Sequence, residues 1–377
     1  MSEAASSRQT MRTLEGMRFL SSVAIVLYHY APYLTQGKSV DETSVRDFYL
    51  FVDLFFVISG IVIGRKYADM EFATSSYLTF LRARFARLYP LHAATLLFYV
   101  AIGLAVVYGG LQIADADRYD FSTLIANLLL VHAWGFTSHF SFNYVSWSIS
   151  AEMFVYLTLP LWVGGARGLR FAWAGGLIFV AVLSILGHIW SFFWLRRGFF
   201  AMTYDFGLVR AIPSFAFGVW LSLYAPTIVA WLRPADLPTW LHFALAIVAA
   251  MLAVHANPNA IAMMFCVVAA LGYFSDLEGK ENLVSSRLLS AQGAYTYSIY
   301  MIHPVVLTVF MGLLAPRWLG TSRLSSALCV GVSLIVTYAL SRASYAYFET
   351  PLRKLINKGI REREPIRHPA ARTGVGA

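Results

Sequence analysis

Long apolar runs alternate with short polar stretches along this chain. The runs lie near residues 16–35, 48–64, 90–108, 122–135, 147–164, 169–190, 208–224, 238–255, 259–275, 294–315 and 324–347. An α-helix needs about 20 mostly apolar residues to cross a bilayer. Most of these runs are apolar on every side, which is typical of buried or lipid-facing helices. The pattern therefore predicts an all-α polytopic membrane protein whose helices surround a central cavity.

The composition agrees with this prediction and excludes several other classes. Hydrophobic residues make up 58% of the 377 residues and charged residues only 13%, whereas a soluble domain has about 25% charged residues. This excludes a soluble enzyme, a disordered chain and a fibrous repeat. The two cysteines, Cys266 and Cys329, each lie inside an apolar run, so no disulfide framework or metal-binding pair is predicted.

The net charge of +9 indicates membrane topology rather than nucleic-acid binding, because the basic residues flank the apolar runs. Arg8 and Arg12 precede the first run, five Lys or Arg lie between 65 and 87, and seven follow Leu352. Cytoplasmic loops carry the excess of Lys and Arg, so both termini are predicted to be cytoplasmic. An even number of spans is then required.

The run at 122–135 is the shortest, and omitting it leaves ten predicted spans from the eleven candidates. Loops 164–170 and 276–287 then lie on the cytoplasmic side, and Arg196 and Arg197 are an exception on the outside. We expect one membrane domain over residues 1–354 and a basic cytoplasmic tail over 355–377. The chain shows no internal repeat of the kind that many transporters contain.

Charged residues inside a membrane span are costly, and they often mark function. In the first span, Arg18 and His29 are eleven positions apart, so they share one helix face about 16 Å apart along the axis. One interpretation is a snorkelling arginine and a hydrogen-bonded core histidine. The other is a lined path, in which the cation holds an anionic group and the imidazole acts as a base.

The second span contains Asp53, and the basic stretch after it contains Arg84 and Arg87. Two arginines one helical turn apart can both bind a phosphate group. Ordinary cytoplasmic positive charge is the alternative explanation for this pair.

Further polar residues occur at the edges of later spans. Glu152 lies a few residues into a span, and a structural ion pair with Arg210 is one explanation for it. His303 and Glu349 lie close to prolines, where each could simply mark a helix end. Histidines with metal-ligand spacing, a P-loop and a nucleophile elbow are all absent from the sequence, so no metal is expected.

Taken together, these stretches resemble the acyltransferase-3 family of integral membrane O-acyltransferases. The resemblance rests on seven motifs in family order: Arg18 to His29; FFVISG at 55–60; Arg84, Arg87 and Pro90; the stretch with Trp147, Ser148, Ser150 and Glu152; Arg210, Phe215 and Gly218; the stretch with Ser298, Tyr300 and His303; and Glu349 with Pro351. The motifs extend over nearly the whole chain. Leu88 replaces the family's isoleucine, and Met17 and Ala151 replace its usual leucine and valine, none of them at a position expected to carry chemistry.

The resemblance implies transfer of an acyl group, usually acetyl, from cytoplasmic acyl-CoA to a sugar hydroxyl. The acceptor would be an exopolysaccharide, a lipopolysaccharide or a lipid-linked glycan at a bacterial cytoplasmic (inner) membrane. It implies His29 as the general base, oriented by Glu152 or Asp53, and donor phosphates on Arg18, Arg84 and Arg87. An acyl-histidine intermediate is an open alternative to direct transfer.

Other residues of these motifs are expected to line the substrate site or to support it. They are Trp147, Ser148, Ser150, Arg210, Ser298, Tyr300, His303 and Glu349, among which Ser148, Ser150 and Tyr300 are candidate donors to the developing oxyanion. The short polar stretch after the last span implies the stand-alone form of the family, without a soluble hydrolase-like domain.

Three alternatives remain at the level of sequence. The acceptor could be a small secondary metabolite such as a macrolide sugar. The chain could instead be a glycan transporter whose intramembrane charges couple to ions, or a membrane sensor or scaffold. Lipid and a glycan are the expected partners, nucleic acid is not, and the oligomeric state is left open.

Overall fold

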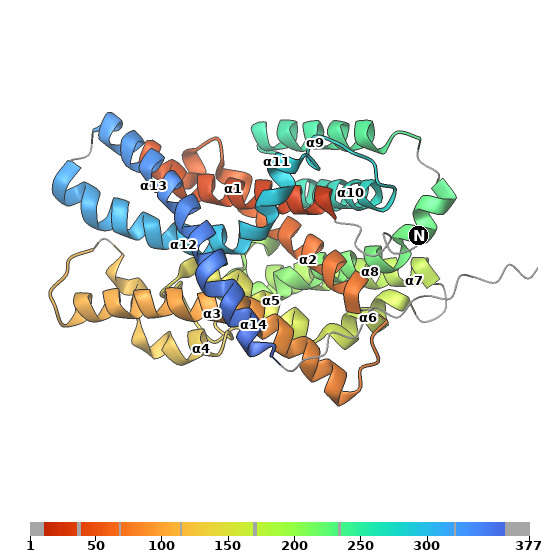
Figure 1. The fold of residues 1–377 in the computed structure, drawn as a ribbon, viewed down its shortest axis with the longest axis horizontal. Helices are drawn as coiled ribbons and strands as arrows, with labels where there is room; N and C mark the ends of the chain where they lie inside the picture. The colour runs from red at the N-terminus through yellow and green to blue at the C-terminus, as the bar shows by residue number, and fades with distance from the viewer. Residues whose placement is uncertain are drawn as a thin grey trace, which may run out of the picture.

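The computed structural model describes residues 11–35, 39–67, 69–113, 115–168, 172–232, 235–319 and 322–358, and these contain helices and loops but no strand. The helices in chain order are α1 (Arg12–Leu34), α2 (Phe51–Tyr67), α3 (Thr74–Val107), α4 (Leu124–Leu128), α5 (Trp147–Leu157), α6 (Leu159–Arg167), α7 (Ala172–Trp190), α8 (Gly207–Leu232), α9 (Leu237–Ala253), α10 (Pro258–Leu277), α11 (Arg287–Ser290), α12 (Thr296–Leu307), α13 (Arg323–Ser344) and α14 (Thr350–Ile356). Figure 1 shows most of the long helices running along the long axis of the molecule. The predicted all-α polytopic class is confirmed.

The number of spans can now be compared with the prediction. Within the described ranges, seven helices are long and apolar enough to cross a bilayer, and α5 with α6, bent by 64°, forms an eighth candidate. The helix α1 is long enough but carries Arg18, His29 and several tyrosines, and α9 is short, with 17 residues. With α1 and α9 added, the helices correspond to the ten predicted spans.

The run at 122–135 does not form a long helix. Only Leu124–Leu128 is α-helical there, and the chain continues as a loop toward α5. Five helical residues extend about 7.5 Å, far short of a bilayer. Leaving this run out of the predicted spans was therefore correct.

Helices α2 and α8 pack side by side along their length in the middle of the molecule (Figure 1). Midway along this contact, a Cβ on Gly60 would lie 2.2 Å from the carbonyl oxygen of Phe215, and one on Gly218 would lie 2.1 Å from that of Val57. Small residues allow helix backbones to approach each other in this way inside membranes. Both glycines belong to motifs recognised in the sequence, and their role here is packing.

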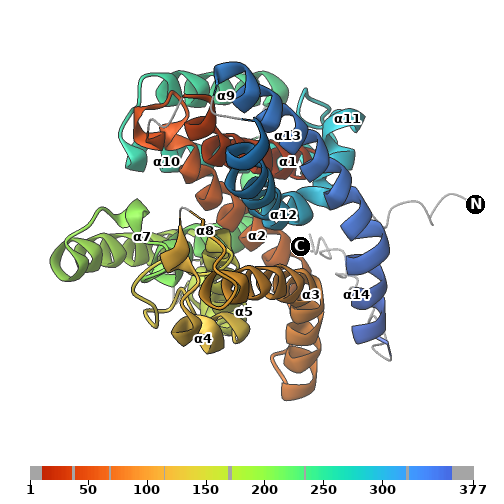
Figure 2. The ribbon, with the colours of Figure 1, turned by 90° about the vertical axis from the view of Figure 1, so that its left-hand side faces the viewer.

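The predicted cytoplasmic segments meet at one end of the molecule, which we call the basic end. There, Arg12 of α1 forms a 2.9 Å ion pair with Glu281. Arg167 lies 3.5 Å from Asp69, and Arg82 donates a 2.6 Å hydrogen bond to the carbonyl of Ile356. In Figure 2, α14 lies beside α3 at this end.

The segments predicted to lie outside meet at the opposite end. The carboxylate of Asp47, before α2, is 2.5 Å from the imidazole of His255, which follows α9. The hydroxyl of Thr137 donates to the carbonyl of Tyr204. The charge pattern therefore sorted the loops correctly into two groups. Most of the predicted basic tail, from residue 359 onward, lies outside the described residues.

Candidate functional site

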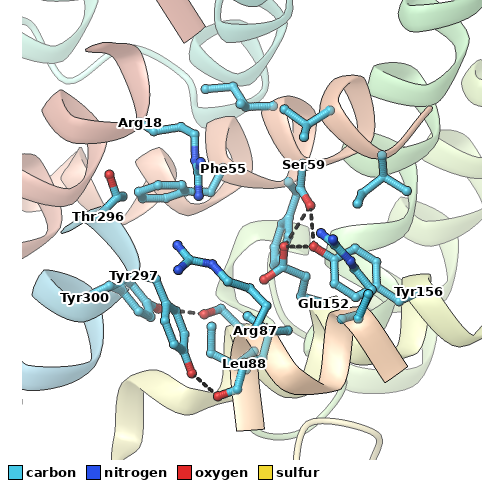
Figure 3. A pocket seen from close by; sticks show the side chains of 18 of the residues that line it. Arg18, Phe55, Ser59, Arg87, Leu88, Glu152, Tyr156, Thr296, Tyr297 and Tyr300 are labelled. Carbon is cyan, nitrogen blue, oxygen red and sulfur yellow. Dashed lines mark hydrogen bonds between the residues drawn. The ribbon is translucent and has the colours of Figure 1, made fainter. Parts of the chain in front are cut away.

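A cavity of about 530 Å³ lies among α1, α2, α3, α5, α12 and α14 (Figure 3). Its volume is in the range of small-molecule and cofactor sites. Six basic side chains and one acidic side chain, Glu152, line it. The basic residues are Arg18, Lys66, Arg84, Arg87, Arg353 and Lys354. This wall is strongly positive, as a site for a phosphorylated ligand requires.

Arg87 is held in place by residues that the sequence had singled out separately. Its guanidinium lies 3.7 Å from Oε2 of the buried Glu349, and it stacks over the ring of Tyr297 at 5.5 Å. The hydroxyl of Ser298 donates a 2.5 Å hydrogen bond to the other oxygen of Glu349, and that of Ser344 donates at 3.0 Å. Tyr297 itself donates to the carbonyl of Leu88, in the turn that follows Arg87 (Figure 3). Ser298 and Glu349 thus support a cavity arginine.

The other two predicted arginines also line the cavity. Arg84 lies 5.6 Å above the ring of Tyr67, and its buried Nε has no hydrogen-bond partner among the described residues. Arg18 forms a 3.3 Å ion pair with Glu15, one turn earlier on α1. Among the described residues, Arg84 therefore makes no ion pair, unlike Arg18 and Arg87.

Glu152 sits at the centre of a small hydrogen-bonded triangle, drawn in Figure 3. Its Oε1 accepts a 2.7 Å hydrogen bond from Ser59 and a 2.5 Å bond from Tyr156, and the two hydroxyls are 2.9 Å apart. Ser59 comes from the FFVISG motif, so this motif supplies both a packing glycine and a polar cavity residue. The structure places Glu152 in the cavity wall and not on the imidazole of His29.

The serines and the tyrosine predicted as oxyanion donors already donate to other groups. Ser148 donates a 2.8 Å bond to the Tyr300 hydroxyl, which donates to the carbonyl of Val145 at 3.0 Å. Ser150 donates to the carbonyl of Leu130 and accepts from the amide of Ala133. Ser148 and Tyr300 line the cavity, whereas Ser150 fixes the loop after α4.

His29 lies beyond the inner wall of the cavity, next to His303. Nδ1 of His29 and Nε2 of His303 are 3.0 Å apart, and the two rings stack with centroids separated by 5.1 Å. The ring of Tyr300, which lines the cavity, is 6.0 Å from that of His303. His303 is fully buried in the interior of α12, and the helix continues through Pro304. The histidine pair therefore lies directly behind Tyr300.

Asp53 and Arg210 form a buried ion pair between α2 and α8, with a shortest distance of 2.7 Å. Arg210 also donates to the carbonyls of Phe200 and Tyr49, and its guanidinium lies 5.2 Å from the ring of Trp147. Arg210 thus pairs with Asp53 rather than with Glu152. These contacts make Asp53, Arg210 and Trp147 part of the helix packing and not of the cavity.

Several cavity residues were not identified from the sequence. Lys66, Arg353 and Lys354 were counted only as topology signals, and Ser59 and Tyr156 were not assigned a role. Tyr156 follows Glu152 by four residues, so the helical period would have placed both on one face. No group of three or more metal-ligating side chains occurs in the described part of the chain.

Comparisons with known proteins identify the family of the chain. A family model for an acyltransferase domain matches residues 11–342. The chain is 24% identical to acyltransferase MdmB of Streptomyces mycarofaciens, over 94% of this chain and 93% of that protein. It is 27% identical to nodulation protein 10 of Rhizobium leguminosarum bv. viciae, over 90% and 92% of the two chains.

A third relative, protein 2 in the picA locus of Rhizobium radiobacter, is 29% identical over 41% of this chain and 82% of that protein. No solved structure matches the chain. The family model covers most of the chain, including six of the seven motifs. The protein therefore belongs to the acyltransferase-3 family and is a multi-pass membrane acyltransferase.

Proposed function

We propose that this acyltransferase moves an acyl group, usually acetyl, from acyl-CoA to a sugar hydroxyl of a surface or lipid-linked glycan. One observation carries the proposal: the cavity has six basic side chains, and the His29–His303 pair lies directly behind its inner wall. An anion-binding chamber next to an imidazole suits a phosphorylated donor whose reactive carbonyl reaches a base.

The donor side is the cavity. Coenzyme A carries several negatively charged phosphates, and arginine binds phosphate through paired hydrogen bonds. Arg84, stacked over Tyr67, and Arg87, aligned by Glu349, both line the cavity and are the phosphate ligands we propose. On α1, His29 is about 16 Å from Arg18, a distance that the extended arm of the coenzyme can cover.

The acceptor side is the opposite face of His29. The half-buried imidazole contacts the rings of Tyr28 and Tyr144, each at a centroid distance of 5.0 Å. From Tyr144, aromatic contacts continue through Phe140 to Tyr204 at the opposite end of the molecule. Tyrosine and phenylalanine offer flat apolar surfaces, and tyrosine adds a hydroxyl. A sugar ring can pack on such a surface with its hydroxyl directed at His29.

The proposed transfer uses one general base, His29, and one nucleophilic attack by the acceptor hydroxyl. His29 removes the proton from the acceptor hydroxyl as the oxygen attacks the thioester carbonyl, forming the new C–O bond. When the C–S bond breaks, His29 returns the proton to the departing thiolate. The products are the acyl ester and free coenzyme A, with His29 neutral again.

The orientation of the protein in the membrane follows from the position of the donor cavity. The basic end should face the cytoplasm, where acyl-CoA is present and where positive loops are retained. The opposite end should face outward, at a bacterial inner membrane. Both termini would then be cytoplasmic.

The test is transfer by the purified protein in lipid nanodiscs. Radiolabelled acetyl-CoA is supplied with either a lipid-linked glycan extract or a panel of small hydroxylated metabolites. We expect alkali-labile label on the glycan fraction only. Label on a small metabolite alone would mean that the acceptor is this metabolite and not a glycan. No label in either fraction, with succinyl-CoA also inactive as a donor, would contradict the proposal.

A further inference from the structure

We infer that His303 is a positioning residue: it holds His29 in the tautomer that carries its proton on Nδ1 and leaves a lone pair on Nε2. This inference deepens the function proposed above, because it states which nitrogen of His29 acts as the base. It rests on the directions of two hydrogen bonds in the structure.

The first hydrogen bond fixes the tautomer of His303. Its Nδ1 is 3.1 Å from the carbonyl oxygen of Ile299, one turn earlier on α12. A carbonyl oxygen only accepts hydrogen bonds, so Nδ1 of His303 must carry the proton. The ring is fully buried and makes no ion pair within the described part of the chain, which disfavours a charged imidazolium. In the neutral ring, Nε2 of His303 is therefore an acceptor.

The second hydrogen bond fixes the tautomer of His29. Because Nε2 of His303 can only accept, the 3.0 Å contact requires Nδ1–H of His29 to be the donor. Nε2 of His29 is then unprotonated and available as a base. In catalytic triads a carboxylate fixes the working histidine in the same tautomer. Here the neighbouring imidazole and a backbone carbonyl provide the same orientation without a charge.

The surrounding packing keeps this arrangement in place. The Tyr30 hydroxyl, one residue after His29 on α1, donates a 3.2 Å hydrogen bond to the carbonyl of His303. It also contacts the hydroxyl of Thr337 on α13 at 3.1 Å. The backbone of α12 is thus bound to α1 at the position where the two imidazoles meet. A rotation of His303 away from His29 would break its bond to Ile299.

The direct test is nitrogen NMR of the full-length protein, labelled with ¹⁵N-histidine, in nanodiscs. Spectra of the His29→Gln and His303→Gln variants assign the two rings by difference. We expect Nδ1–H on His29 in the wild type. In His303→Leu, whose side chain accepts no hydrogen bond, the backbone carbonyl of Ile25 is the remaining acceptor, and we expect a larger fraction of the Nε2–H form. Glutamine places a carboxamide oxygen near the former Nε2, so His303→Gln should retain the wild-type tautomer.

Acyl transfer provides the second measurement. We expect His303→Leu to lower kcat at least about 100-fold, the lower range of general-base catalysis, while KM for acetyl-CoA changes less than about twofold. His303→Gln should recover most of the rate, which a merely structural role would not predict. A wild-type His29 protonated on Nε2, or a His303→Leu variant with unchanged tautomer and kcat, would overturn the inference. If the wild type transfers no acyl group, the proposed function fails, and the NMR result still decides the tautomer.

Discussion

Arg18, Arg84 and Arg87 all line the cavity, and each has a different neighbour. Glu15 pairs with Arg18 and Glu349 with Arg87, whereas Arg84 lies over the face of Tyr67 and forms no ion pair with any described residue. A charge without a protein counter-charge contributes most when an anionic ligand arrives. Arg84 should therefore contribute more to donor binding than its two neighbours.

Replacement of Arg84 by glutamine tests this directly. We expect Arg84→Gln to raise KM for acetyl-CoA about 10- to 100-fold, corresponding to the 1.5–3 kcal/mol of a hydrogen bond to a charged group, with a smaller change in kcat. Arg287→Gln is the control, because Arg287 is exposed and lies outside the cavity lining. Equal effects in both variants would mean that the cavity does not bind the donor.

The sequence predicted which residues lie at the candidate site better than it predicted which side chains they contact. Arg18, Arg84 and Arg87, the predicted donor ligands, all line one cavity, and Glu152, predicted to orient His29, lies in the same wall instead. The expected orientation of His29 by a carboxylate does not match the contacts, because the side chain that forms a hydrogen bond with the His29 ring is His303, 274 positions away. Motif spacing within one helix places residues on a face, but it does not say which other helix packs there.

At the scale of helices, α2 and α8 carry the central contact of the fold. Gly60 and Gly218 allow the two backbones to touch, and the Asp53–Arg210 pair joins the same two helices nearby. The sequence placed Gly60, Gly218 and Arg210 in motifs and singled out Asp53 as a charge within a span, but it did not show that these residues meet. Motif residues such as Gly60 and Arg210 can therefore serve helix packing.

The glycine contact can be tested with alanine. Gly60→Ala should lower the thermal unfolding temperature in detergent, because overpacking a close contact costs about 1–3 kcal/mol. The control is Gly331→Ala on α13, where an added Cβ meets nothing within 4 Å and helix propensity favours alanine. If the two variants unfold at the same temperature, the helices are not in close contact at Gly60.

The ion pair gives a separate prediction about stability. Asp53→Asn should destabilise the protein by about 3–5 kcal/mol, because Arg210 is left buried without its counter-charge. Asp236→Asn is the control, since Asp236 is an exposed cap on α9 and asparagine caps equally well. Transfer per folded molecule should change little. A folded Asp53→Asn variant of normal stability but without activity would instead assign Asp53 to catalysis.

At the scale of the whole molecule, the two ends differ in charge and in proposed role. Charge counting predicted which loops lie together, and contacts such as Arg12–Glu281 and Asp47–His255 confirm the grouping. The family match makes the chain an acyltransferase, so the transporter and sensor interpretations are set aside. Loop charges alone did not reveal the cavity, because its wall combines residues from both halves of the chain.

The proposed orientation predicts which loops are accessible from outside the cell. In a C266S/C329S background, a membrane-impermeant maleimide should label Asn257→Cys in intact spheroplasts but not Glu281→Cys. Both positions are exposed, one at each end of the molecule. Both should react after the membrane is opened. The reverse pattern would place the donor cavity on the outside and contradict the proposed use of cytoplasmic acyl-CoA.

The central claim is that the protein moves an acyl group to a glycan with His29 as the general base, and the most direct test is the number of acetyl esters on cell glycans. Three kinds of cells are compared: cells that produce the wild-type protein, cells that lack the protein, and cells that produce His29→Ala at the same level in the membrane. His242→Gln is the control, because glutamine can also accept the hydrogen bond from the amide of Leu283. We predict esters that depend on the protein, persist in His242→Gln and disappear in His29→Ala. Esters that persist in His29→Ala would contradict this account.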